Sequence, residues 1–184
     1  SPGTYSPPNW PDFVFGRWQP WWYWDWYYPP YRGETKVETF SGVTDASGTH
    51  YLQLDFEQEG EPQPMSIRAE ATVMDVNRQA WAAATTLLVH PADLYVGLRC
   101  DRTFVQRGEP LKIDIIVTDL DGAPVPDRPV QVQAARMEWR TVRGTWQQEA
   151  VDVQDCSVGT GQEPVTCTFK TEMGGQNQLT ATVT

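Results

Sequence analysis

The chain has 184 residues, which is enough for one large domain or for two domains of about 100 residues each. Apolar residues make up 40% of the chain, and 24 acidic against 14 basic residues give a formal net charge of −10. This charge argues against nucleic acid and anionic membranes as partners, because both are bound chiefly by clustered Lys and Arg side chains. No apolar run approaches the roughly 20 residues of a membrane-spanning helix.

Residues 1–12 are rich in Pro, Ser and Asn, with prolines at positions 2, 7, 8 and 11, and this composition predicts an irregular lead. No basic segment followed by an apolar stretch marks a secretory signal. We therefore interpret the chain as an excised piece of a longer protein, whose export signal would lie outside it.

Residues 13–31 are unusually aromatic, and five tryptophans form the centre of this segment: Trp18, Trp21, Trp22, Trp24 and Trp26. On a strand, alternating rings would lie on both faces. Three interpretations remain open: rings packed within a core or against a neighbouring domain, a platform that stacks on sugars or peptides, and contact with a membrane interface.

Between residues 33 and 90 the sequence predicts strands. Apolar residues alternate with polar ones from Leu52 to Phe56 and again from Met65 to Val73, the period of a half-buried strand. Residues 81–89 contain an alanine run that would also suit a helix. The β-branched Thr85, Thr86 and Val89 favour a strand there.

The pattern of a strand with one buried and one wet face is strongest over residues 111–118. Leu111, Ile113, Ile115 and Val117 alternate there with Lys112, Asp114 and Thr118. A turn over residues 119–122 follows, and prolines precede the next strand, which begins near Val130. Asp119-Leu-Asp-Gly superficially resembles the start of a calcium loop, but it lacks the later oxygen ligands of an EF-hand, so a tight turn is the favoured interpretation.

Three cysteines are unevenly placed. Cys156 and Cys167 flank a turn-like stretch, so antiparallel strands on either side of it would bring them together in a disulfide. Two small buried side chains without a bridge are the alternative. Cys100 is left without a partner, and none of the three cysteines has the spacing of a zinc site.

An internal repeat is visible when residues 36–56 are laid on residues 150–170, and residues 65–73 on residues 176–184. The overlay predicts two tandem immunoglobulin-like β-sandwich domains in an all-β chain, the first over residues 13–91 and the second over residues 92–184. The first would lack its opening strands and the second its closing strand. The unpaired strand edges would allow self-association.

No catalytic, metal-binding or cofactor-binding residues are predicted. His50 and His90 have no Ser, Cys or acidic partner at the spacing of a triad or metal site. The acidic cluster of Glu57, Glu59 and Glu61 lies beside two prolines, and we interpret it as a solvated loop rather than a weak cation site.

Several stretches, in this order and at this spacing, resemble the macroglobulin-like domains of large bacterial α2-macroglobulin-like proteins, most closely the third and fourth. The stretches are F-V-F-G-R-W-Q-P-W-W-Y-W (13–24), T-F-S-G-V-T-D-A-S-G-T-H-Y-L (39–52), A-E-A-T-V-M-D-V-N-R-Q (69–79), L-V-H-P-A-D-L-Y-V-G-L (88–98) and R-G-E-P-L through P-V-Q-V (107–132). Together they cover most of residues 13–135.

The resemblance implies a structural part of a non-enzymatic protease trap. In that family a protease cuts a bait segment, the domains rearrange, and an internal Cys-Glu thioester can capture the enzyme; the bacterial members are commonly periplasmic and often lipid-anchored. The implied partners are proteases, through the full-length parent, and neighbouring macroglobulin-like domains. This chain has no Cys-x-Glu-Gln, so thioester chemistry cannot reside in it. The competing hypothesis is an aromatic-platform module of a surface adhesin that binds carbohydrate or protein.

Overall fold

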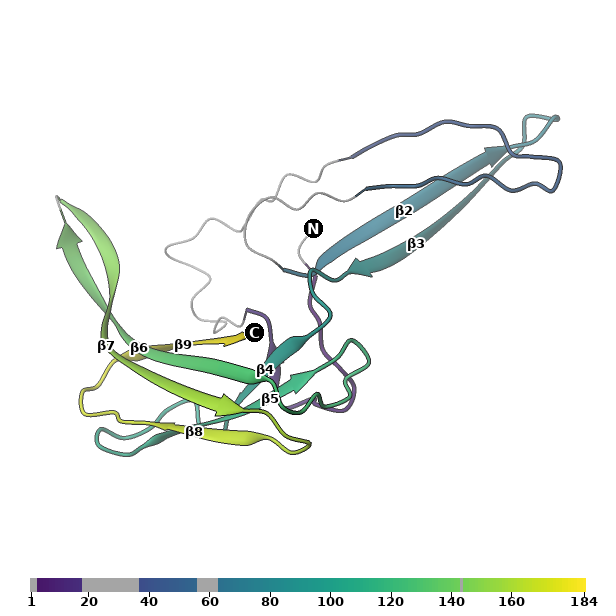
Figure 1. The fold of residues 1–184 in the computed structure, drawn as a ribbon. Coiled ribbons are helices and arrows are strands. Elements are labelled where there is room, and N and C mark those ends of the chain that lie inside the picture. Colours follow the sequence, from purple (N-terminus) through teal and green to yellow (C-terminus); the bar gives the residue numbers. More distant parts are fainter. Residues whose placement is uncertain (1–2, 18–36, 56–62, 143) are drawn as a thin grey trace. The chain divides into compact units, whose positions relative to one another are not determined.

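The computed structural model describes residues 3–17, 37–55, 63–142 and 144–184. All regular structure in these residues is β, which confirms the all-β class. The nine strands of the described part are β1 (Val14–Phe15), β2 (Met65–Met74), β3 (Ala80–Val89), β4 (Tyr95–Cys100), β5 (Leu111–Thr118), β6 (Pro129–Val142), β7 (Thr145–Gly159), β8 (Val165–Phe169) and β9 (Gln176–Val183) (Figure 1).

The chain divides into two compact units. The first unit contains Ser1–Gly3 and Pro20–Pro91, and the second contains Thr4–Gln19 and Ala92–Thr184. The expected second domain began at residue 92, and residues 1–19 were divided between a lead and the first domain. The structure instead groups Thr4–Gln19 with the second unit, because apolar side chains of this segment are buried there.

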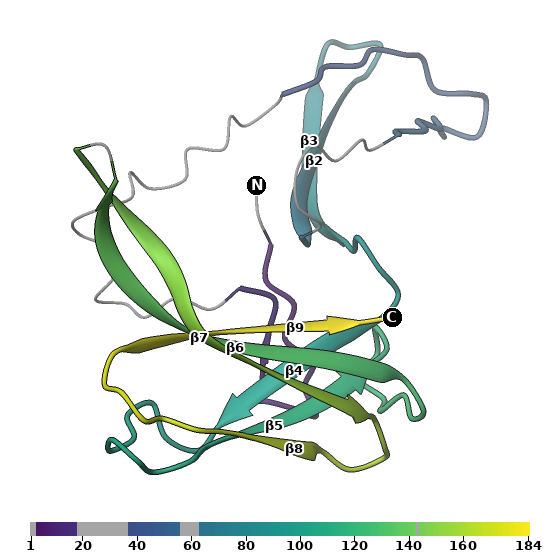
Figure 2. The ribbon, with the colours of Figure 1, turned by 60° about the vertical axis from the view of Figure 1, so that its left-hand side comes forward.

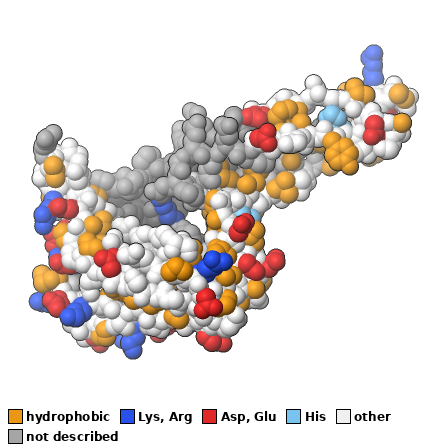
Figure 3. Space-filling model, in the orientation of Figure 1, with side chains coloured by type: hydrophobic (Ala, Val, Ile, Leu, Met, Phe, Trp, Pro, Cys, Tyr) orange, Lys and Arg blue, Asp and Glu red, His pale blue; other side chains and the backbone are white. Residues whose placement is uncertain are grey.

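The described strands of the first unit form one antiparallel hairpin, β2–β3, paired over ten residues on each strand from Met65↔Val89 to Met74↔Ala80. The prediction of strands over residues 65–73 and 81–89 is therefore confirmed, but most of their side chains are exposed rather than half-buried. Hydrophobic side chains lie at the surface over this hairpin (Figure 3). The strand expected from Leu52 to Phe56 is wrong over its described residues 52–55, which pair with no described strand and are exposed.

The second unit is a sandwich of two antiparallel sheets, with strand orders β1-β4-β5-β8 and β7-β6-β9 (Figure 2). Its main core lies between the sheets. The buried members of that core are Leu111, Ile113, Ile115, Val117, Val130, Val132, Ala134, Cys167 and Phe169. The predicted inward residues of the strand over 111–118 are all in this list, so the period-2 pattern was read correctly on that face.

The opposite face of β5 departs from the prediction of a wet face. Lys112 is exposed, but Ile116 is 1% exposed and Thr118 is fully buried. A second, smaller core covers this end of the strand and consists of Tyr5, Phe13, Phe15, Tyr95 and Ile116. The sandwich therefore carries an additional layer, supplied by the N-terminal segment of residues 4–17.

Candidate functional site

The five tryptophans of the expected platform, Trp18, Trp21, Trp22, Trp24 and Trp26, lie outside the described residues, as do Glu57, Glu59 and Glu61. Earlier members of the aromatic run are described. Phe13 and Phe15 are each 5% exposed, and Trp10 packs beside them, with its ring 5.4 Å from that of Phe13 and nearly perpendicular to it. In this part of the run the rings belong to a core.

Two side-chain hydrogen bonds attach the N-terminal segment to the turn after β5. The Tyr5 hydroxyl donates to the carbonyl oxygen of Asp119 at 2.7 Å, and the Trp10 indole Nε1 donates to the carbonyl oxygen of Gly122 at 2.9 Å. The Tyr5 ring lies 4.2 Å from that of Tyr95. Burial, followed by the neighbouring Tyr5, raises the pKa of Tyr95. Both phenols therefore act here as neutral, packed groups.

Gly97 in the middle of β4 has a packing reason. It lies opposite Phe15 of β1, and a Cβ atom on Gly97 would lie 2.5 Å from Cζ of that ring. Glycine in a strand commonly marks such a close approach. The Phe15 ring thus covers the backbone of β4 and closes the smaller core.

An ion pair borders the smaller core. The Arg99 guanidinium bonds the Asp114 carboxylate at 2.7 Å and lies 4.9 Å above the centre of the Phe13 ring. The Thr166 hydroxyl donates to the other carboxylate oxygen of Asp114 at 2.6 Å. The hydrogen bond from Thr166, followed by that from Arg99, lowers the pKa of Asp114. This group joins β4, β5 and β8 on one face of their sheet.

Three turns of the chain share one hydrogen-bonded design and begin at Asp45, Asp75 and Asp119. In each, a carboxylate oxygen of the aspartate accepts backbone N–H groups two and four residues further on, at 2.8 to 3.0 Å. The residue three positions on has a positive φ: Gly48 (81°), Arg78 (63°) and Gly122 (82°). The tight turn predicted at Asp119 is therefore confirmed, and its carboxylate is already engaged by the backbone.

Cys156 and Cys167 are joined in a disulfide, and Cys100 is free and exposed. The pair is the expected one, but its setting differs from the expected hairpin. Cys156 lies on β7 and Cys167 on β8, which belong to different sheets. The chain crosses from one sheet to the other between them, so the bridge connects the two layers of the sandwich, and Cys167 is 1% exposed in the core.

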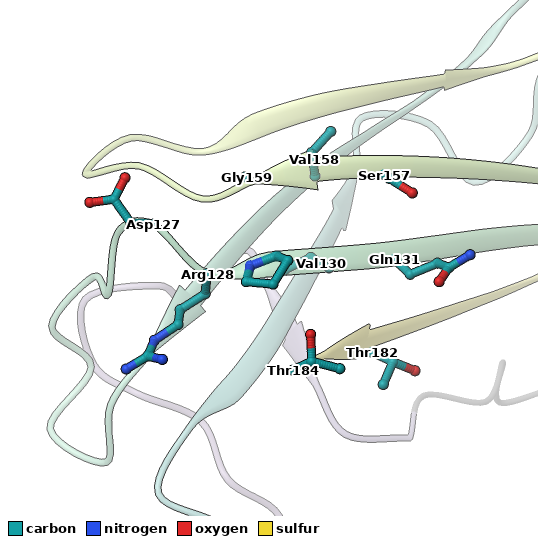
Figure 4. A pocket seen from close by; sticks show the side chains of 10 residues that line it. Asp127, Arg128, Val130, Gln131, Ser157, Val158, Gly159, Thr182 and Thr184 are labelled. Carbon is teal, nitrogen blue, oxygen red and sulfur yellow. The ribbon is translucent and has the colours of Figure 1, made fainter.

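The end of the three-stranded sheet carries an open depression of about 530 Å³. Figure 4 shows that its lining comes from the start of β6, the end of β7 and the end of β9. Ser157, Thr182 and Thr184 supply hydroxyl groups, and Asp127 and Arg128 are the ionisable side chains of the lining. A hydroxyl needs a neighbouring base to act as a nucleophile, and this lining offers it no histidine or lysine.

The other sequence candidates lie apart from this depression. The His50 ring packs against Gly42 in the first unit, and the thiol of Cys100 donates to the carbonyl oxygen of Arg102 at 2.9 Å. Among the described residues, no group of three or more His, Cys, Asp or Glu side chains is placed to hold a metal ion. The described part of the chain also contains no helix with the length and apolarity required to cross a membrane.

The residues that sequence reasoning missed are those of the N-terminal segment, above all Tyr5, Phe13 and Phe15. A signal for them was present in β5. Ile116 interrupts the alternation by placing an apolar residue on the face expected to be wet, which indicates that something covers that face. The sequence alone does not identify the covering segment, which lies about a hundred residues earlier.

No protein-family profile matches the chain. Its fold is similar to part of Salmonella α2-macroglobulin, solved as the crystal structure of the protein reacted with methylamine. The TM-score is 0.50 with 14% sequence identity, covering 99% of this chain and 14% of that one. The native conformation of E. coli α2-macroglobulin matches at a TM-score of 0.45 and 15% identity, covering 98% of this chain and 12% of that one.

A curated protein of Dictyostelium discoideum, circularly permutated Ras protein 2, is 28% identical over 102 residues, which are 50% of this chain and 3% of that protein. The chain thus spans only a small part of each protein to which it is similar. At these identities the structural similarity establishes the fold, which is that of macroglobulin-like β-domains.

Proposed function

We propose that this chain is a structural section of a larger α2-macroglobulin-like protease inhibitor, formed by two macroglobulin-like domains that correspond to the third and fourth of the parent. The observation that carries the proposal is the similarity to Salmonella α2-macroglobulin, which extends over 99% of the chain and thus includes both units in one order. The absence of Cys-x-Glu-Gln fits this role, because a scaffold section needs no thioester.

The disulfide supports placing the parent outside the cytoplasm, in the periplasm or beyond. Structural disulfides persist in oxidising compartments and are rare in reducing ones. Cys156–Cys167 lies between two sheets, with one sulfur in the core, and so has a structural position. In this proposal proteases are partners of the parent, and neighbouring macroglobulin-like domains are the direct partners of this section.

The test uses the parent protein incubated with a broad-spectrum protease. A trap leaves the bound protease active on a small chromogenic peptide while shielding it from a large protein substrate. Gly97→Ala, which disturbs the smaller core, should reduce this shielding at elevated temperature, whereas Lys112→Ala on the exposed face of β5 should leave it unchanged.

Two outcomes would overturn the proposal. One is a parent that gives no differential protection between small and large substrates. The other is direct inhibition of a protease, or incorporation of labelled methylamine, by this chain alone. Binding of a glycan by the chain, with loss of binding in Trp22→Ala, would favour the adhesin alternative instead.

A further inference from the structure

The last strand, β9, has one bonded edge and one open edge. It pairs with β6 in the register Val130↔Val183 to Met137↔Gln176 and forms one end of the strand order β7-β6-β9. The Thr184 N–H donates to the Pro129 carbonyl oxygen at 3.2 Å, which fixes which residues point toward β6. In an antiparallel pair the hydrogen-bonded positions alternate.

It follows that Thr182, Thr180 and Gln178 direct their backbone groups toward β6. The residues between them direct theirs outward, and these are Asn177, Leu179, Ala181 and Val183. Within the described part of the chain, no backbone or side-chain group is bonded to these outward N–H and C=O groups. β9 therefore presents four consecutive donor and acceptor pairs on its open edge.

The other sheet ends of the second unit carry features that discourage strand addition, and β9 carries none. β1 has two residues and β8 has five. β7 contains three acidic residues, one of which, Asp152, has a positive φ of 50° near an irregularity in the register with β6. β9 is eight residues long, uncharged and free of proline. Charges, irregularities and short length are the means by which proteins protect sheet edges.

We propose that the open edge of β9 pairs with the β9 edge of a second copy of this chain. The antiparallel arrangement has a two-fold axis at Thr180, where Thr180 of one copy lies opposite Thr180 of the other. Leu179 then lies opposite Ala181, and Asn177 opposite Val183, so that every outward backbone group meets a partner. The two sheets of order β7-β6-β9 become one continuous six-stranded sheet.

The side chains favour a second copy over an unrelated partner. Leu179, Ala181 and Val183 all pack toward the main core. In the symmetric register, core-facing residues of one copy neighbour core-facing residues of the other. The exposed Gln178, Thr180 and Thr182 neighbour one another on the outer face, and paired threonines across strands are favourable. Although the chain carries a net charge of −10, no charged residue of β9 lies at the axis.

Sedimentation equilibrium of the 184-residue chain tests the proposal between about 1 μM and about 1 mM, a range that includes weak, reversible association. Ala181→Pro removes an outward N–H and leaves the bonds to β6 intact. Thr180→Lys places two like charges opposite each other at the axis. Ser157→Lys is the matched control, because it makes the same charge change at an exposed position of β7, on the far edge of the same sheet.

We expect a concentration-dependent dimer that each edge variant weakens by at least about tenfold, because two symmetric backbone hydrogen bonds or a repulsive pair are at stake in each. The control should stay within about twofold of the parent chain. Hydrogen exchange of the unmodified chain provides a second readout that needs no variant: the amides of Leu179, Ala181 and Val183 should exchange more slowly as the concentration rises. A monomer throughout the range, an association that both edge variants leave unchanged, or edge amides insensitive to concentration would overturn the proposal.

Discussion

Reduction of the disulfide between β7 and β8 should lower the stability of the second unit by an amount that can be worked out from the chain. Cys156 and Cys167 are separated by 11 positions. Closing a loop of this length removes about 2.8 kcal/mol of conformational entropy from the unfolded chain at 25 °C. For a unit of about 110 residues, with an unfolding entropy of roughly 2.1 cal/mol/K per residue, this corresponds to a fall in Tm of about 12 °C.

The double variant Cys156→Ala/Cys167→Ala should lose slightly more than reduction alone. Cys167 is 1% exposed, so truncation to alanine also leaves a small void in the main core, at a cost of about 1 kcal/mol. Differential scanning calorimetry with and without a reducing agent separates the two contributions, since the reducing agent should have no effect on the double variant.

Cys100→Ala is the control and should not change the Tm, because Cys100 is free and exposed. The reasoning would be refuted by a reduced chain that melts within about 3 °C of the oxidised one, because that corresponds to less than about 1 kcal/mol. Recovery of three free thiols from the unreduced, unfolded chain would refute the pairing itself.

Three smaller changes test other parts of the second unit. Thr118→Val should raise the stability by about 1 kcal/mol in chemical denaturation, because the buried Thr118 hydroxyl has no hydrogen-bond partner in the described structure; a destabilised variant would indicate a partner there. Gly97→Ala should lower the unfolding free energy by about 1–3 kcal/mol, because its Cβ would overlap the aromatic ring packed on it; unchanged stability would show that the ring moves without cost. The lowered pKa of Asp114 means that its carboxylate stabilises the fold above the pKa of the unfolded chain and that this contribution is lost as the pH falls through the folded pKa. Below about pH 4 the stability of Asp114→Asn should therefore fall less steeply than that of the parent chain, and parallel curves would contradict the role assigned to Thr166 and Arg99.

Local patterns were sufficient to predict much of the second unit. The alternation from Leu111 to Val117 identified a strand and its core face, because one residue in two meets the opposite sheet. The aspartate and glycine after β5 identified a turn, since Gly122 adopts the positive φ that the turn requires. Both features depend on neighbours within a few residues, which is the range that sequence patterns describe well.

Features that depend on distant partners were not predictable in the same way. Leu52 and Leu54 alternate with polar residues as a strand would, but a strand also needs a bonded neighbour, and no described strand pairs with them. The disulfide pair was expected from its flanking turn, yet the turn connects two sheets rather than two strands of one sheet. The candidate platform around Trp22 lies outside the described residues, so the three interpretations of that segment stay predictions.

The division of the second unit between Thr4–Gln19 and Ala92–Thr184 has a consequence for the order of events during protein synthesis. β1 leaves the ribosome early but pairs with β4, in the register Val14↔Leu98 and Phe15↔Gly97, more than 80 residues later. Until Ile116 and the following turn emerge, Tyr5, Phe13 and Phe15 have no core to enter and expose apolar rings to chaperones and to other nascent chains. Slow translation over residues 92–118 would prolong this exposure. The yield of folded protein should therefore be sensitive to synonymous codon changes in that interval, even though these changes leave the native structure untouched.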